Sequence, residues 1–236
     1  MSVSLSSEFD IFAPKPVQAS VDQSDLEFLI PADSDTYINL IIRLYIRGKL
    51  TKNCGRNLDN TDFTAVTNNF LHSLFSQCSI ALNGVTITQA TELYYYHSFF
   101  ETILTYCSDA ATSFLTNAFW YLDDGDLLPC DPTAADAKNK DFITGWDRIK
   151  QNKEVQHYGR IHSDICNVPL NVIPGLRLQI GLTKAKSRFY LMNKVDSTTV
   201  FKFLDAQLLV NRVRPSPSLL LAHNTTLAKV LSHGII

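Results

Sequence analysis

The stretch from residue 37 to residue 47 alternates apolar and polar side chains at every second position. Its apolar members are Ile38, Leu40, Ile42, Leu44 and Ile46, and the residues between them include Asn39, Arg43 and Arg47. The pattern returns late in the chain at Leu176, Leu178, Ile180 and Leu182. Because successive side chains of a strand point to opposite sides of the sheet, both stretches predict half-buried antiparallel strands.

Turn signals separate further short strands. Residues 26–30 form an apolar run that Pro31 ends, and Asn83-Gly84 predicts a tight hairpin between residues 78–82 and 85–88. Other strands are expected at residues 159–166, 175–183, 189–192 and 199–213, with a β-bulge in the last one because its apolar phase changes after Phe203. About eight strands joined by hairpins and long connections predict a mainly β, antiparallel jelly-roll sandwich with inserted helices.

The remaining segments complete the expected organisation. Residues 1–24 are predicted to form an N-terminal arm, and residues 25–214 a jelly-roll domain. Within that domain we expect a polar loop at 48–62, a helical turn at 69–75, a two-helix insertion at about 91–122 and a loop at 123–141. Residues 215–236 are predicted to form a C-terminal helix, capped by Ser218, that leads toward a missing second jelly roll.

Composition restricts the classes of function. The formal net charge of −2 gives no overall attraction to nucleic acid. The five cysteines are widely spaced and lack a C-x-x-C pair, which indicates free thiols, with Cys78 as a buried apolar residue of its strand. The chain shows no signal peptide and no apolar run long enough to span a bilayer, so we expect an intracellular protein that is not secreted and does not span a membrane.

The sharpest enzymatic candidate is His162-Ser163-Asp164. A His-x-Asp pair on a jelly-roll strand, joined by a later histidine, is typical of a two-histidine, one-carboxylate iron site. The later histidine has to be His223 or His233, and both lie in or beyond the predicted closing helix. The competing interpretation places Arg160, His162 and Asp164 on the polar outer face of a strand, and we favour that interpretation.

Three other groups of residues allow both a functional and a structural interpretation. Asp123, Asp124 and Asp126 offer calcium-type oxygens, but their spacing fits no EF-hand loop, and a solvated turn is favoured. Two basic spots, at Lys184, Lys186 and Arg188 and at Arg212 and Arg214, are interpreted as solubilising turn residues rather than contacts to nucleic acid or to an acidic partner surface. The aromatic run Tyr94, Tyr95, Tyr96, Phe99 and Phe100 exceeds what one helix face needs, which is typical either of an interface or of a helix wedged between sheet and loop.

Several strings, taken in order, resemble one family. They are residues 68–77 (NNFLHSLFSQ), 96–106 (YHSFFETILTY), 189–192 (FYLM), 201–206 (FKFLDA) and 219–224 (LLLAHN). Together they resemble the major capsid protein encoded by Polinton (Maverick) transposons and the related adintoviruses, over nearly the whole chain from the arm onward. Such proteins are double jelly rolls, and this chain corresponds to the first barrel only.

The resemblance implies a structural role. It implies a virion protein that self-associates as a homotrimer, forms pseudo-hexagonal capsomers and contacts other capsid subunits. It implies no catalytic residue, no cofactor, no metal, no small-molecule substrate, and nucleic acid contact only through non-specific packaging. Because the sequence stops at Ile236, we expect a truncated, decayed or mispredicted copy that is aggregation-prone or only marginally stable on its own. The alternatives are a domesticated β-sandwich interaction module and the iron oxygenase.

Overall fold

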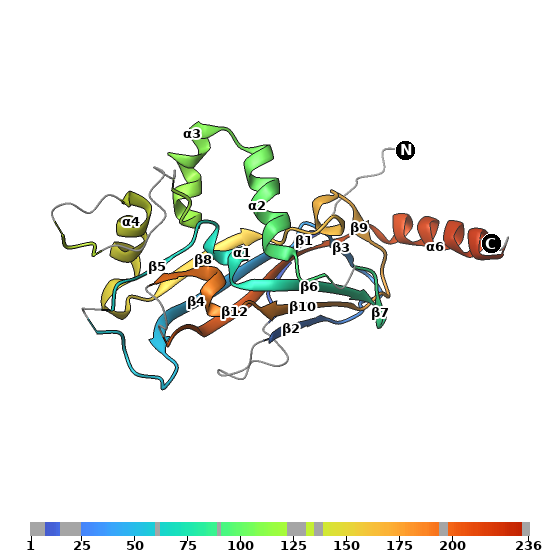
Figure 1. The fold of residues 1–236 in the computed structure, drawn as a ribbon. Helices are drawn as coiled ribbons and strands as arrows, with labels where there is room; N and C mark the ends of the chain where they lie inside the picture. Colours follow the sequence, from blue (N-terminus) through green and yellow to red (C-terminus); the bar gives the residue numbers. More distant parts are fainter. Residues whose placement is uncertain are drawn as a thin grey trace.

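The computed structural model describes residues 8–14, 25–59, 62–88, 91–121, 131–134, 139–193 and 198–232. Two antiparallel sheets face each other within these residues (Figure 1). The larger sheet has the order β8 (Val155–Arg160), β4 (Arg43–Lys52), β12 (Thr199–Arg214), β3 (Tyr37–Asn39) and β9 (Asn171–Val172), and β1 (Glu8–Phe12) also pairs with β12. The second sheet has the order β2 (Asp25–Ile30), β10 (Leu178–Lys184), β6 (Phe75–Leu82) and β7 (Val85–Thr86), and a small third sheet joins β11 (Leu191–Asn193) to β5 (Thr64–Val66).

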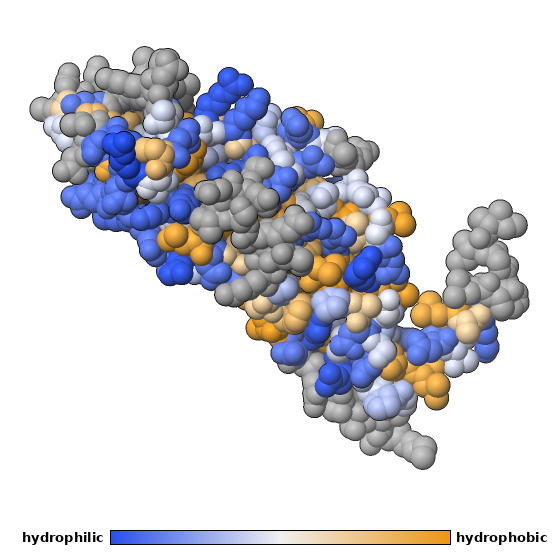
Figure 2. Space-filling model, turned by 90° about the horizontal axis from the view of Figure 1, so that it is seen from below, coloured by the Kyte–Doolittle hydropathy of each residue, from blue (hydrophilic) through white to orange (hydrophobic). Residues whose placement is uncertain are grey.

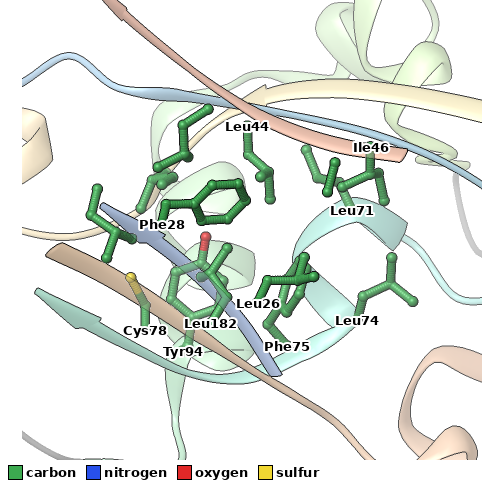
Figure 3. Packing of buried hydrophobic residues seen from close by; sticks show 14 of the residues in the cluster. Leu26, Phe28, Leu44, Ile46, Leu71, Leu74, Phe75, Cys78, Tyr94 and Leu182 are labelled. Carbon is green, nitrogen blue, oxygen red and sulfur yellow. The ribbon is translucent and has the colours of Figure 1, made fainter. Parts of the chain in front are cut away.

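The main core fills the space between the two large sheets. Leu44 and Ile46 of β4 point from one side toward Phe28 of β2 and Leu182 of β10 on the other (Figure 3). Burying an aliphatic or aromatic side chain of this size stabilises a fold by roughly 1.5–3 kcal/mol each. The alternation seen in the sequence is therefore the inward face of each sheet, as predicted.

The segment from residue 37 to residue 47 is two strands rather than the single strand that was predicted. Asn39 ends β3 because its side-chain oxygen accepts a hydrogen bond from the Ile41 N–H at 2.8 Å, and a tight turn then joins the Ile42 N–H to the Leu40 carbonyl at 2.9 Å. Both pieces still pair with β12. The second piece continues to Lys52, so the predicted loop at 48–62 begins five residues too early.

The predicted β-bulge in β12 is confirmed. The register against β4 shifts between Phe203 and Asp205, which leaves Leu204 as the extra residue. Gly48 lies opposite Phe203, and a Cβ atom added there would lie 2.4 Å from the Phe201 ring and 2.5 Å from the Lys202 carbonyl oxygen. A side chain at position 48 therefore has no room.

We expect Gly48→Ala to lower the free energy of unfolding by about 1–3 kcal/mol, because the added methyl group must displace backbone as well as the Phe201 ring. Urea unfolding measures the change. Gly55→Ala is an unsuitable control because Gly55 has positive φ, so Ala81→Ser at a half-buried strand position serves instead. Unchanged stability of Gly48→Ala would contradict this account of the bulge.

Other local predictions had mixed outcomes. The helical turn, α1 (Phe70–Ser73), and the hairpin that pairs Leu82 with Val85 are confirmed. The strand expected at 159–166 instead begins at Val155, ends at Arg160 and is followed by a short 3-10 turn, η3 (Ile165–Asn167). The strand expected at 189–192 is half helical, because α5 (Ser187–Tyr190) precedes β11. The described residues contain twelve strands rather than about eight, several of them only two or three residues long.

The helical insertion contains α2 (Tyr94–Thr105), α3 (Ser108–Ala111) and the 3-10 helix η1 (Phe114–Ala118), which rise above the sandwich (Figure 1). A further helix, α4 (Lys140–Ile149), was not predicted and is followed by η2 (Lys150–Asn152). It starts inside the expected 123–141 loop. The side-chain oxygen of Asn139 caps it by accepting a hydrogen bond from the Phe142 N–H at 2.8 Å. An asparagine directly before a helix is a capping signal that is visible in the sequence itself.

The two ends of the described chain differ in how they relate to the sandwich. The expected arm contains β1, a strand that extends the larger sheet along β12. The closing helix, α6 (Pro217–Ser232), begins one residue before the predicted cap Ser218, with proline at its first position. It projects from one end of the body with hydrophobic residues exposed along it (Figure 2).

Candidate functional site

Helix α2 is attached to the body through polar side chains. Its buried residues are Tyr94, Ser98 and Thr102, which repeat every four residues and so share one face. The Asn69 amide donates to Ser98 Oγ at 3.1 Å, and the Tyr94 hydroxyl lies 3.0 Å from His72 Nδ1. Inward hydrogen bonding of this kind leaves the apolar residues of the helix to point elsewhere.

The outward face of α2 is apolar. We call the exposed residues that begin just before the helix and run along it the α2 ridge: Leu93, Tyr96, Phe100, Ile103 and Leu104. Phe100 is 58% exposed and Leu104 is 84% exposed. Single exposed apolar residues are common on protein surfaces, but five of them on about three helical turns form a patch of the kind that marks an interaction surface.

Two hollows flank this ridge. One, of about 350 Å³, lies between the loop before α1 and the aromatic residues Tyr95, Phe99 and Phe189. The other, of about 660 Å³, lies between the hairpin after β6 and the loop after β8. Tyr96 and Phe100 line both hollows, so the ridge stands between two concave surfaces. A partner whose surface is complementary to the ridge and its two hollows would bury more apolar area than a partner with a flat surface would.

The His-x-Asp motif lies beside the second hollow, on a loop and not on a strand. His162 Nδ1 donates to Glu101 Oε2 at 2.7 Å, and the Asn167 amide donates to Glu101 Oε1 at 3.0 Å. Burial lowers the pKa of His162, and Glu101 only partly offsets this effect. Burial raises the pKa of Glu101, but the hydrogen bond and charge attraction from His162, with smaller contributions from Asn167 and His97, outweigh burial and the net pKa is lowered. Glu101 therefore ties α2 to this loop.

The structure does not bring the proposed iron ligands together. The Tyr37 hydroxyl contacts His223 Nδ1 at 2.5 Å on α6, whereas His162 is paired with Glu101, and His233 lies outside the described residues. Asp164 is nearly fully exposed and lies 3.5 Å from His97. Among the described residues, no group of three His, Cys, Asp or Glu side chains is arranged to hold a metal ion. The interpretation of 160–164 as an outer strand face is also wrong, because the strand ends at Arg160.

A second histidine is buried beneath this pair. The ring of His72 packs edge-on against His162 with ring centroids 4.5 Å apart. Burial lowers the pKa of His72 far below its usual range, and the nearby His162 and His157 lower it further. Neutral histidines under α2 are thus part of the hydrogen-bonded support of the ridge. Sequence reasoning missed this cluster, because residues 72, 157 and 162 converge only in the fold.

The basic spots are structural in part. The Lys184 ammonium donates to the Phe201 carbonyl oxygen at 2.6 Å, and burial lowers its pKa. Arg212 stacks its guanidinium over the Phe12 ring at 3.9 Å, which helps fix β1 against the sheet. These two residues are therefore not the solubilising turn residues that were predicted, whereas Lys186 is exposed. The three aspartates at 123, 124 and 126 lie outside the described residues.

The described cysteines divide into two buried and two exposed thiols. Cys78 is buried as predicted, and burial raises the pKa of its thiol to about 12. Cys166 is also buried, with a pKa likewise raised to about 12. Cys54 and Cys107 are exposed free thiols, and Cys130 lies outside the described part of the chain. In that same part, no helix has the length and apolar character needed to cross a membrane.

Comparisons with known proteins point to one group of structures. No protein-family model matches the chain, and no curated protein sequence matches it. A chain in the cryo-EM structure of the Sputnik virophage is similar with a TM-score of 0.53 at 9% identity, covering 92% of this chain and 50% of that one. Chains in the quasi-atomic PBCV-1 virus capsid and in PBCV-1 VP54 fitted into a Sputnik reconstruction have TM-scores of 0.45 at 11% identity, covering 94% of this chain and 46% of each of theirs.

This chain thus spans about half the length of the solved chains that it matches. At 9% identity the likeness to the virophage chain bears on the fold alone. It agrees with the two facing antiparallel sheets and the inserted helices described above. The chain is an antiparallel jelly-roll sandwich with inserted helices.

Proposed function

We propose that the chain is a structural capsid protein that forms the first barrel of a double jelly roll. The observation that carries this proposal is the likeness of nearly the whole chain to about half of a chain in a virus particle. The role needs a rigid core and surfaces that neighbours cover, and it needs no active site. The buried core and the α2 ridge meet both requirements.

The proposal extends to identity and assembly. The strings quoted above support a major capsid protein of a Polinton (Maverick) element or adintovirus, located in the virion. In that role three full-length chains build a pseudo-hexagonal capsomer, and this chain acts without cofactor, metal or catalytic residue. The divisions at residues 24 and 214 then separate the arm, the barrel and the linker helix toward a second barrel.

Self-association of the 236-residue chain tests the proposal. We expect sedimentation velocity to show concentration-dependent oligomers or aggregates, because exposed apolar surface associates when no partner covers it. The double variant Phe100→Asp and Leu104→Asp should shift the distribution toward monomer and lower the association constant at least tenfold. Both side chains are mainly exposed, so the barrel itself should keep its melting temperature.

Leu170→Asp is the matched control, because Leu170 is an exposed leucine (60%) on the loop before β9 rather than on α2. Equal effects of the control and the ridge variant would overturn the role of the ridge. A wild-type chain that stays monomeric at high concentration would contradict the capsid proposal and favour the second candidate, a domesticated interaction module that uses the same ridge for a different protein.

A further inference from the structure

The outward face of three neighbouring strands is basic. Side chains of β4 that point away from the core are Arg43, Tyr45, Arg47 and Lys49, at alternate positions between buried residues. Alternate residues on one face of a strand lie about 6.7 Å apart. In the sequence, these residues are the polar positions that alternate with the buried apolar positions of the strand.

The sheet register extends the face onto both neighbours of β4. Lys202 of β12 lies opposite Lys49, and Arg160 of β8 lies opposite Arg43. Tyr158 of β8 lies opposite Tyr45 and is 57% exposed. We call these seven residues the basic face: Arg43, Tyr45, Arg47, Lys49, Tyr158, Arg160 and Lys202. Two tyrosines side by side are thus bordered by cationic side chains from three strands (the strands β8, β4 and β12 in Figure 1).

Positive charge dominates this face although the whole chain carries a net charge of −2. Two carboxylates lie on this face or next to it. Asp205 lies opposite Arg47, and Glu154 lies 3.6 Å from the Arg47 guanidinium. The Arg47–Glu154 pair has both side chains more than 40% exposed, so it is weak and open to exchange with another anion. Arg160 is held in place because its guanidinium donates to the Cys166 carbonyl oxygen at 2.8 Å.

We propose that the basic face binds single-stranded nucleic acid. Lysine and arginine contact phosphates electrostatically, and exposed aromatic rings on a sheet stack with unpaired bases whatever their sequence. Charge complementarity selects a polyanion, and the exposed Tyr158 ring beside the half-buried Tyr45 selects one with unpaired bases that can stack. The site is independent of the proposed capsid role, because it rests on β4, β8 and β12 and not on the α2 ridge.

The test uses fluorescence anisotropy with a labelled 20-nucleotide oligo-dT and the whole chain, between 50 and 200 mM salt. Binding should weaken steeply with salt, since each phosphate contact contributes about 0.7 to the slope of log affinity against log salt for a single strand. Lys49→Gln with Lys202→Gln should lower affinity at least tenfold and reduce that slope by about 1.4. Tyr158→Ala should lower affinity about tenfold, the effect of losing one stacked base.

The matched control is Lys186→Gln with Lys229→Gln, which makes the same change in net charge on exposed residues away from the face. Thermal melting of each variant checks that the barrel is intact. The proposal predicts near wild-type binding for the control and weaker binding to a duplex of the same length. Absence of binding at 50 mM salt, equal losses in both double variants, or an unaffected Tyr158→Ala would overturn it.

Discussion

Phe70→Ala is expected to lower the free energy of unfolding by about 3–5 kcal/mol, the range for removing a large aromatic side chain from a packed core. Phe70 is fully buried at the start of α1. Its ring centroid lies 5.2 Å from that of Phe201 and 5.4 Å from that of His157, in edge-on contacts. Since domains are stable by only about 5–15 kcal/mol, this single change should leave the barrel marginal.

Urea unfolding followed by tryptophan fluorescence measures this effect. Phe114→Ala is the control, because Phe114 is the same residue type but 54% exposed, and we expect a change of less than about 1 kcal/mol there. Similar losses in the two variants would show that the helical insertion, and not the contact between α1 and the sheets, governs stability.

Acidification is expected to destabilise the protein between pH 6.5 and pH 4, a range that begins well above the pH at which most carboxylates protonate. Burial lowers the pKa of His157 to about 4, and it lowers the pKa values of His72 and His162 as well. An unfolded histidine has a pKa near 6.5, so the unfolded chain binds more protons as the pH falls below that value. Stability is therefore fully present above pH 6.5 and declines as the pH approaches 4.

The size of this effect follows from the shift. For His157 alone, a fall from 6.5 to about 4 corresponds to roughly 3 kcal/mol of stability lost by pH 4. Glu101 acts in the same direction at lower pH, because its pKa is lowered in the folded state and its stabilising contribution is lost when it is protonated. The histidine contribution therefore occupies the range between pH 6.5 and pH 4.

Urea unfolding at pH 7.5, 5.5 and 4.5 checks the prediction. His157→Phe should flatten the pH dependence, since His157 is buried among the aromatic rings of Phe70 and Phe119 and its Nε2 atom has no hydrogen-bond partner. The matched control is His97→Gln, which removes a more exposed histidine. A wild-type stability that is flat from pH 7.5 to 4.5 would contradict the assignment of neutral buried histidines.

The sequence predicted correctly the features that depend on neighbours along the chain. Strand alternation, the Asn83-Gly84 turn and the phase change in β12 are local, because backbone geometry alone sets which face a side chain takes. These features are enough to predict two packed sheets, and so the jelly-roll class. The same local reasoning did not predict α4, although the sequence shows its capping residue Asn139. It also predicted that strands continue past Asn39 and Arg160, whereas both strands end there and the two side chains form hydrogen bonds to the residues that follow.

The orientation of α2 depends on contacts between residues that are far apart in the sequence. Helical periodicity in the sequence locates an apolar stripe but does not say whether that stripe faces the core. Here Asn69 and His72 supply hydrogen-bonding partners from a distant loop and helix, so Ser98 and Tyr94 face inward and Phe100 faces solvent. The positions of His72, His157 and His162, and the union of three strands into the basic face, depend in the same way on long-range pairing. Local sequence thus determined the strands and the faces that they bury. Contacts between distant residues determined which surfaces remain available to partners. The reason is that burial of a polar group is favourable only where the fold supplies its hydrogen bonds.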